Sequence, residues 1–421
     1  MIKKIKIYIT LAAVAFSSVS CLDKYPEDAI PEGDAIRTVE EANQAVIGIY
    51  AYMKNPNLYS GLLTLLPDLQ ADLAYAVEGY TNTYGNIWRW DILPTNTEVE
   101  AVYGTLNALI GKCNFLLERI AILEQEVDDE DYEKLQQFKG EALFARALAY
   151  SDLIKMYCKA YDPATAADEL GVVLVSSYSN TGTLKRASLK DSYQFVLDDL
   201  AQSATCLEPD ENENDESYYD TPYFTIYAVN ALYARVYLNM QEWDKAIEYA
   251  SKVIDSRKFK LSSTTEMIDS ETSYYQYMWQ YDHSTETIWK VGFTTTSYGG
   301  SLGQIFFNYD FNSFKPDYVP AEWVLNLYAD TDLRATTFFQ SYRTGYEHGL
   351  QWPLLAKYFG NQEFYEQNIL HVTMPKVFRL SEQYLIRAEA YCQKSNPEYG
   401  KGANDLTTLR QARYSNYGSA S

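Results

Sequence analysis

Residues 223–255 constrain the fold of this chain more than any other segment, because their pattern fits two helices packed against each other. Ala234 and Tyr237 lie near the end of the first predicted helix, and a short polar turn follows. Trp243 and Ala246 then begin a stripe of spacing three and four on the second helix. Small residues let two helices approach closely, while large rings fill the space around the contact. The pattern predicts a helical hairpin.

Looser copies of this hairpin occur at two other places in the chain. Residues 379–413 repeat the small-and-large pair with Ala388 and Tyr391. A third copy begins at Ala147, but its second helix starts only at Ser188. Three copies resemble tetratricopeptide repeats, in which helix pairs stack on one another. Generic helix pairing is the alternative.

Most of the remaining chain also has the periodicity of amphipathic helices, interrupted by loop-rich stretches. A short strand is predicted at residues 286–295, where apolar and polar residues alternate. We expect helical repeats at about 36–54, 97–160, 188–256 and 378–415, and a less regular, loop-rich part at about 55–96 and 257–375. The predicted fold class is therefore mainly α, a tetratricopeptide-like scaffold with a loop-rich subdomain.

The amino terminus reads as a leader sequence rather than as part of a folded core. Three lysines precede an apolar run at residues 7–19, which is too short to span a membrane. Val19 and Ser20 then precede Cys21, as in a bacterial lipobox. We expect residues 1–20 to be a lipoprotein signal peptide and Cys21 to carry the lipid anchor, with an ordinary secretory signal as the alternative. Because no other stretch is apolar enough to span a membrane, the mature protein is expected to be soluble and tethered.

Charge and cysteine usage exclude several classes of function. A formal net charge of -22 repels nucleic acid, so we expect no DNA or RNA partner. The four cysteines after Cys21 are far apart and form neither a disulfide framework nor a metal-binding pattern. The three histidines also lack ligand spacing, so no metal and no cofactor is expected.

Candidate binding residues lie where aromatic side chains occur in loops. The chain holds 39 tyrosines, and a tyrosine ring is apolar on its faces and polar at its tip. An aromatic ring can stack on the C–H face of a sugar while polar neighbours bond its hydroxyls. The early loop offers such a set at Tyr80, Tyr84, Asn86, Trp88 and Arg89. The alternative for the tryptophan is a plug where the loop packs on the scaffold.

An ordered set of motifs resembles one known family. They are Cys21-Leu22-Asp23 with Pro26 soon after, a helix ending Gly48-Ile49-Tyr50, "GEALFARALAYSDLIKMY" from Gly140, "ALYARVYLNMQEWDKAIEYASKVI" from Ala231, and "RLSEQYLIRAEAY" from Arg379. In this order they resemble the SusD/RagB family of surface lipoproteins of Bacteroidota. Family members usually continue past the "NDLTTLRQAR" helix, so the usual C-terminal segment is expected to be missing.

The resemblance implies a single SusD-like domain over residues 21–421 and a function at the cell surface. It implies an outer-membrane lipoprotein, facing the exterior, that captures oligosaccharides and delivers them to a TonB-dependent, SusC-like transporter. In the family the glycan site combines an early loop with later loops, which adds Tyr298 and Asn308 to the candidates.

Two other functions stay open at this point. One is capture of peptides or glycopeptides, as in proteins resembling RagB. The other is a surface glycoside hydrolase. The sequence "GGSLG" at residues 299–303 matches the G-x-S-x-G nucleophile elbow, but that motif needs an alternating α/β sheet around it. We therefore predict no catalytic residue and no enzymatic activity.

Overall fold

The structure, a computed structural model, describes residues 35–77, 83–178, 184–207, 218–309, 311–346 and 351–417. The expected leader and Cys21 lie outside these ranges, so lipidation stays a prediction. Within the described ranges, no helix combines the length and the apolar character that crossing a membrane demands.

Helices dominate the described residues, and the mainly α fold class is confirmed. The longer helices are α2 (Val39–Tyr52), α3 (Leu62–Gln70), α5 (Thr97–Leu123), α6 (Asp129–Tyr157), α7 (Leu189–Cys206), α8 (Ile226–Asn239), α9 (Trp243–Asp255), α15 (Leu380–Gln393) and α16 (Tyr399–Gln411). The shorter ones are α4 (Gly85–Trp88), α10 (Tyr274–Gln280), α11 (Gln304–Phe307), α12 (Glu322–Leu325), α13 (Arg334–Phe338), the 3-10 helix η3 (Ala356–Tyr358) and α14 (Gln362–Tyr365).

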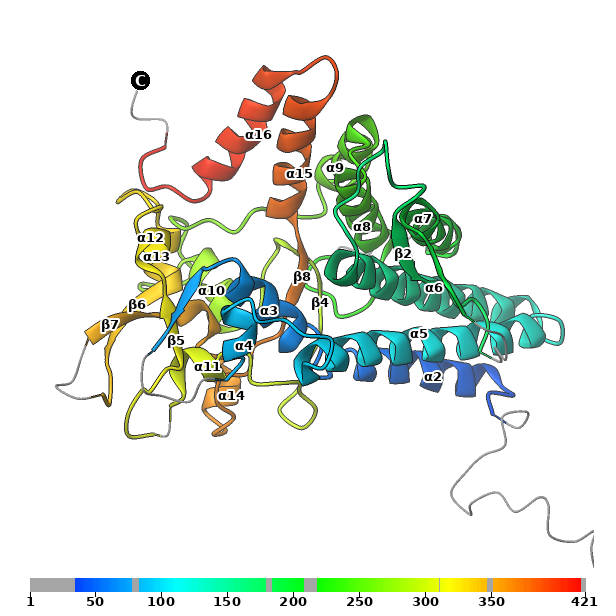
Figure 1. The fold of residues 1–421 in the computed structure, drawn as a ribbon, viewed down its shortest axis with the longest axis horizontal. Helices are drawn as coiled ribbons and strands as arrows, with labels where there is room; N and C mark the ends of the chain where they lie inside the picture. The colour runs from blue at the N-terminus through cyan, green and yellow to red at the C-terminus, as the bar shows by residue number, and fades with distance from the viewer. Residues whose placement is uncertain are drawn as a thin grey trace, which may run out of the picture.

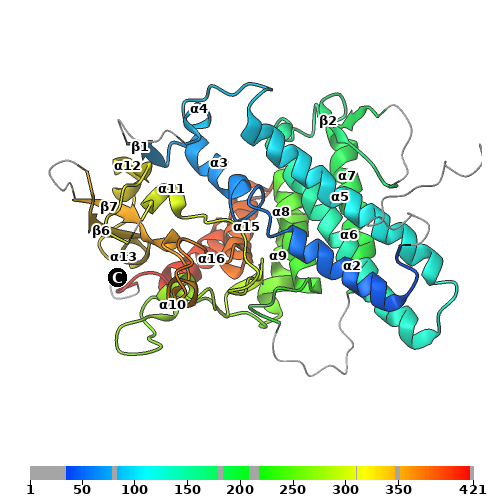
Figure 2. The ribbon, with the colours of Figure 1, turned by 90° about the horizontal axis from the view of Figure 1, so that it is seen from below.

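The longer helices form one stacked scaffold. Helix α2 packs on α5 and α6, and from α6 the contacts pass to α7, α8, α9, α15 and α16 in turn. Figure 1 shows this array on the right and top of the molecule, with the less regular part at the lower left. Figure 2 shows α2, α5 and α6 side by side from below. The loop-rich part therefore lies against one end of the scaffold.

Side-chain caps fix where several of these helices begin. Ser188 Oγ accepts a hydrogen bond from the Asp191 N–H (3.0 Å), so α7 starts at the predicted N-cap. Thr38 Oγ1 accepts one from the Glu41 N–H (3.1 Å) at the start of α2. Such a bond satisfies one of the amide donors that a helix leaves open at its first turn.

The contact among α8, α9 and α15 has the predicted small-residue character. Ala234, Ala246, Ala250 and Ala390 are fully buried there beside Ile386. The larger rings of the first hairpin, Tyr237 and Trp243, pack at the edge of this cluster. The small residues let the helices approach closely, and the rings pack around the edge of the contact. This is the helix packing that the sequence predicts.

A buried polar network joins α5, α6 and α7. The Arg146 guanidinium donates to both carboxylate oxygens of Asp199, at 2.8 and 2.6 Å. Its third bond goes to Asn114 Oδ1 at 2.7 Å. Asn114 in turn donates to the carbonyl of Val175 (2.9 Å). The network therefore fixes three helices and one loop relative to each other.

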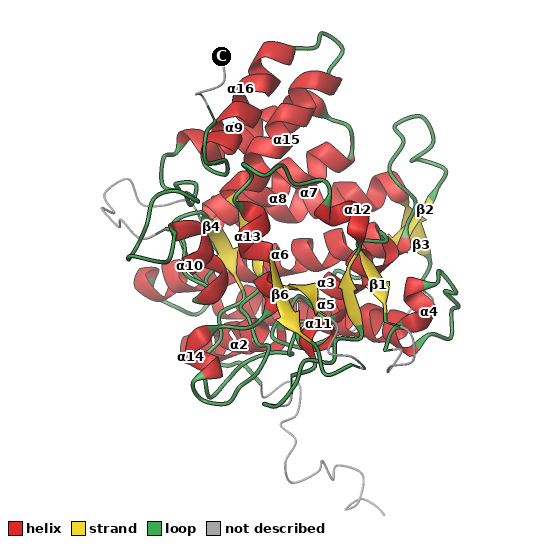
Figure 3. Ribbon diagram, turned by 90° about the vertical axis from the view of Figure 1, so that its left-hand side faces the viewer, coloured by secondary structure: helices red, strands yellow, loops and turns green. Residues whose placement is uncertain are grey.

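The strands are short and form two-stranded antiparallel pairs scattered among the helices (Figure 3). The pairs are β1 (Ala74–Ala76) with β5 (Tyr318–Pro320), β2 (Leu170–Val173) with β3 (Arg186–Ser188), β4 (Thr287–Lys290) with β8 (Lys376–Arg379), and β6 (Phe339–Arg343) with β7 (Gln351–Leu355). A separate apolar cluster around Phe307, Tyr318 and Leu354 forms the core of the loop-rich part.

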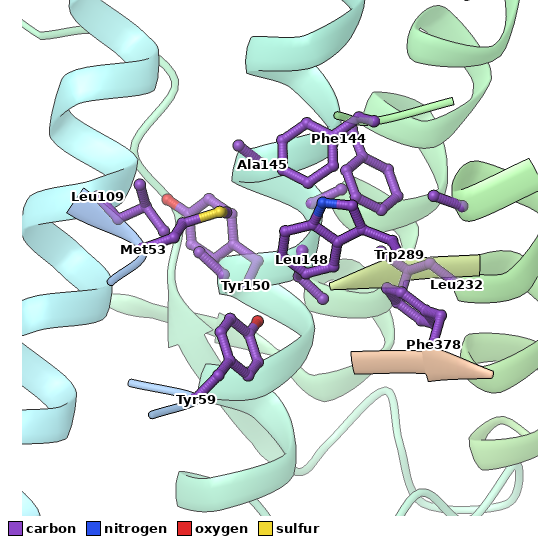
Figure 4. Packing of buried hydrophobic residues seen from close by; sticks show 14 of the residues in the cluster. Met53, Tyr59, Leu109, Phe144, Ala145, Leu148, Tyr150, Leu232, Trp289 and Phe378 are labelled. Atoms are coloured by element: carbon purple, nitrogen blue, oxygen red, sulfur yellow. The ribbon is translucent and has the colours of Figure 1, made fainter. Parts of the chain in front are cut away.

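Strand β4 joins the loop-rich part to the scaffold. The sequence predicts a strand with alternating faces here, but all four residues of β4 are buried. Trp289 is fully buried, and Figure 4 shows it surrounded by Phe144, Leu148 and Leu232 of the helices and by Phe378 of β8. Helix α8 packs against both β4 and β8, and the burial of all four residues shows that neither face of β4 is left to solvent.

Candidate functional site

A cavity of about 320 Å³ lies where the turn before α3 meets the loop that leads into α11. This volume falls within the usual range for small-molecule sites. The residues lining it are Pro56, Ser60, Gly61, Leu65, Thr83, Tyr84, Gly300, Ser301, Gln304, Ile305, Asn308 and Asp317. We call it the glycan cavity, after the ligand that the family resemblance predicts. It combines an early loop with a later loop, the arrangement that the family resemblance implies.

Two polar contacts hold the walls of the glycan cavity together. The Gly300 N–H donates to Ser60 Oγ at 2.9 Å, and the Lys54 ammonium donates to Ser297 Oγ at 3.0 Å. A Cβ at position 300 would lie 2.8 Å from the Ser60 carbonyl oxygen. Glycine is therefore needed here because the two backbones approach so closely.

Tyr84 and Asn308, both predicted site residues, line the glycan cavity from its two sides. Each has left-handed backbone geometry, with φ of 60° at Tyr84 and 42° at Asn308. Tyr84 is half-buried, and burial raises the pKa of its phenol, so the hydroxyl stays protonated at neutral pH. Asn308 accepts a hydrogen bond from the Gln304 amide at 2.8 Å. The cavity thus offers one aromatic ring beside amide groups.

Asp317 adds an acceptor with unused capacity. Its Oδ2 accepts a hydrogen bond from Thr83 Oγ1 (3.0 Å), while its buried Oδ1 has no hydrogen-bond partner among the residues that the structure describes. Burial raises the pKa of this carboxyl, although the bond from Thr83 opposes the rise. A buried polar atom without a partner costs free energy, which a ligand hydroxyl could recover by donating to it.

Three other predicted residues lie on or beside α4 and do not line the glycan cavity. The Trp88 indole N–H donates to the Ala74 carbonyl (2.8 Å), and its ring packs edge-on against Tyr318. Trp88 thus packs as a plug against the loop-rich core, the alternative left open by the sequence. Asn86 and Arg89 are exposed and bond to each other at 2.9 Å. Ligand contact by these three stays a prediction.

The remaining two candidates differ in how far the structure places them. Tyr298 is 45% exposed, packs near Phe364, and precedes Gly299 and Gly300 at the margin of the glycan cavity. Tyr80 lies outside the described residues, so its place in a site stays a prediction.

Several residues of the site were missed because their signal in the sequence is weak. Thr83, Gln304 and Asp317 are isolated polar residues with no motif around them, and only the fold brings them together. Trp90 was passed over as a site residue, yet it is 63% exposed and has a left-handed φ of 59°.

The G-x-S-x-G match does not have the context of a nucleophile elbow. Ser301 precedes the four-residue helix α11, and the described segment before it is a loop. The nearby His371 ring contacts the Phe359 carbonyl through Nδ1 and the Tyr309 N–H through Nε2. Within the described ranges, no three His, Cys, Asp or Glu side chains are placed to hold a metal ion.

Comparison with known proteins identifies the family. Residues 22–238 match the SusD-like family described as "Starch-binding associating with outer membrane". The chain belongs to the SusD-like family. SusD-like protein P2 of Formosa agariphila is 23% identical over 257 residues, which are 60% of this chain and 46% of that protein. SusD-like protein P25 of the same organism is 22% identical over 72% of this chain and 54% of its own length. The chain thus spans about half the length of these relatives.

Solved structures of SusD-like proteins share the fold. A SusD superfamily protein from Bacteroides thetaiotaomicron aligns with a TM-score of 0.74 at 22% identity, over 90% of this chain and 81% of that chain. A protein from Bacteroides vulgatus described as a putative sugar-binding protein gives 0.72 at 23% identity, over 92% and 81%. Surface glycan-binding protein A from Bacteroides uniformis gives 0.69 at 17%, over 90% and 81%. The SusD-like fold expected from the sequence motifs is confirmed.

Proposed function

We propose that this SusD-like protein is a non-enzymatic, lipid-anchored protein of the outer-membrane surface that captures oligosaccharides and delivers them to a TonB-dependent, SusC-like transporter. The glycan cavity is the proposed capture site. Tyr84 offers its ring to the C–H face of a sugar, and Asn308 and Gln304 offer amides to its hydroxyls.

The observation that carries the proposal is Asp317 Oδ1 on the cavity lining, a buried acceptor to which none of the described residues donates a hydrogen bond. Sugar hydroxyls are donors that could satisfy it. Related structures described as a putative sugar-binding protein and as a surface glycan-binding protein support the same function. Transfer to a transporter and the lipid anchor rest on the family resemblance and on the sequence around Cys21.

Calorimetry with neutral oligosaccharides tests the capture site. The full chain is purified in a mild detergent and titrated with glucans, mannans and xylans of three to six residues. We expect weak, reversible binding of at least one class. In Tyr84→Ala the affinity should fall roughly tenfold, because removing one stacked ring loses on the order of 1–2 kcal/mol of apolar contact.

Two further variants separate loss of binding from loss of folding. Gln304→Ala removes an exposed lining residue and should weaken binding without changing thermal stability. Tyr132→Ala removes an exposed tyrosine of α6 that does not line the cavity and should bind as the wild type does. Equal affinity in all three variants would place the site elsewhere. Turnover of the glycan would contradict the non-enzymatic proposal, and peptide binding in its place would favour the RagB-like alternative.

A further inference from the structure

A second cavity, of about 440 Å³, lies between the helical scaffold and the loop-rich part. Five cationic side chains line it, contributed by α6, α8, η3 and β8: Lys155, Arg235, Lys357, Lys376 and Arg379. Among the described residues, the carboxylates that line it are Asp152 and Glu382. The whole chain has the opposite balance, with 35 Lys and Arg against 57 Asp and Glu. We call this cavity the cationic pocket. Its excess of positive side chains cannot follow from the composition of the chain, which is acidic.

Two of the five cations are closed into ion pairs. Arg235 bonds both oxygens of Glu382, at 2.7 and 2.8 Å. The Lys376 ammonium lies 2.5 Å from Asp282 Oδ1, and Asp282 is fully buried. These pairs are structural and leave little capacity for a ligand.

The other three cations are compensated only by longer contacts. Lys155 lies 3.5 Å from Asp152 Oδ1. Arg379 contacts Glu286 at 3.4 Å only, and the other oxygen of Glu286 is held at 2.6 Å by Arg413. Along the described chain, no carboxylate lies within 4.0 Å of the Lys357 ammonium, so this cation has no ion-pair partner.

Lys357 is nevertheless charged and partly removed from water. Its ammonium lies 4.5 Å from the centre of the Tyr358 ring and 5.6 Å from that of Trp279. Burial lowers the pKa of Lys357, but Tyr358 and Asp68 raise it, and the net direction is upward. Tyr358 and Asp68 thus keep the ammonium charged without a direct ion pair, so an anionic ligand could supply the missing close contact.

Trp279 supplies an apolar wall with a free donor. Its ring lies 5.0 Å from the Lys376 ammonium and 5.3 Å from the Arg379 guanidinium. The buried indole N–H has no hydrogen-bond partner in the described part of the chain. A ligand that carries both an apolar ring face and anionic oxygens matches this combination of ring, donor and cations.

We propose that the cationic pocket binds the anionic group of an acidic sugar residue, a uronate carboxylate or a sugar sulfate. The proposal rests on the proposed function for the sugar part of the ligand and adds the acidic class. It makes the cationic pocket a subsite distinct from the glycan cavity, because no residue lines both.

Calorimetry on the full chain compares three probes in low-salt buffer: trigalacturonate, a sulfated trisaccharide and a neutral trisaccharide. At least one acidic probe should bind about tenfold tighter than the neutral one, since a charge-assisted bond is worth at least that factor. The acidic probe that binds identifies carboxylate or sulfate as the anion. Its affinity should fall as salt rises, while that of the neutral probe should not. Inorganic sulfate should compete with the acidic probe only.

Matched variants locate the effect in the cationic pocket. Lys357→Gln and Arg379→Gln should each weaken the acidic probe roughly tenfold and leave the neutral probe unchanged. Lys245→Gln makes the same change of charge on an exposed residue of α9 and should have no effect. The salt dependence of the wild type keeps the test decisive if a pocket variant fails to fold.

The failures of the two proposals can be told apart. Neutral binding without any preference for an acidic probe overturns the acidic subsite and leaves the proposed function standing. A preference that persists in both pocket variants also overturns the subsite. If no oligosaccharide binds, neutral or acidic, the proposed function falls and the subsite falls with it.

Discussion

Replacing Arg146 by methionine should destabilise the scaffold more than any change at its surface. Arg146 and Asp199 are 8% and 3% exposed, and their two bonds measure 2.6 and 2.8 Å. Arg146→Met removes the partner of a buried carboxylate and one bond to Asn114. Breaking a buried pair on one side costs about 3–5 kcal/mol, because an uncompensated charge stays behind.

The double variant tests whether that cost arises from the stranded charge. Arg146→Met with Asp199→Leu removes both charges, and replacing a buried pair by apolar groups is often close to neutral. We expect the double variant to recover to within about 1–2 kcal/mol of the wild type. Urea unfolding followed by far-UV circular dichroism measures the shift, read as a change of midpoint at constant slope.

A partly exposed ion pair between α6 and the end of α5 provides the control. Lys139 bonds Glu124 at 3.0 Å, and both side chains retain contact with solvent. Lys139→Met should therefore cost less than about 1 kcal/mol. If Arg146→Met shifted the midpoint no more than Lys139→Met, or if the double variant were as unstable as the single one, the argument from buried charge would be refuted.

Two further changes probe the junction between the scaffold and the loop-rich part. Trp289→Ala should lower the free energy of unfolding, measured in urea, by about 3–5 kcal/mol. The substitution empties a fully buried ring site and removes the indole N–H that donates to the Pro222 carbonyl at 2.9 Å. A loss under about 1 kcal/mol would show that the ring is not part of the core. Glu286→Gln should be less stable than the wild type at neutral pH and approach it in acid. Burial raises the pKa of Glu286, but the positive charges of Arg413 and Arg379 lower it by more, so the pKa lies below its ordinary value. The stabilisation that ionised Glu286 gives the fold is therefore complete above the unfolded-state pKa of about 4.3 and is lost as pH falls through the lower folded-state pKa. Identical pH profiles of unfolding for the wild type and Glu286→Gln would contradict a lowered pKa at Glu286.

The helical scaffold could be predicted from the sequence because its signals are local. Small residues at Ala234, Ala246 and Ala250 recur at helical spacing, and each is fully buried at the predicted contact. The cap at Ser188 is likewise a local preference that the fold keeps. Periodicity of this kind predicts the packed face of a helix, because each helix buries one stripe of its own surface.

The site could be predicted only in part because it forms across long distances in the chain. Asp317 bonds Thr83, 234 positions away, and Gly300 bonds Ser60, 240 positions away. Neither pair has a pattern that periodicity could detect. The aromatic residues were a better guide, but the count of rings does not tell a plug such as Trp88 from a wall such as Tyr84. That difference depends on which side of a loop faces the core.

The scaffold also determines the geometry of both cavities through one short turn. Tyr59 donates to Asp152 of α6 at 2.5 Å and packs edge-on against Trp289, so the turn is fixed to the helices. The next residue, Ser60, accepts the bond from Gly300 that closes the glycan cavity. Tyr59 lines the cationic pocket and Ser60 lines the glycan cavity, so adjacent residues serve the two cavities. The buried contacts of Tyr59 therefore do more than stabilise the fold, because they also fix the position of the turn that lies between the two cavities.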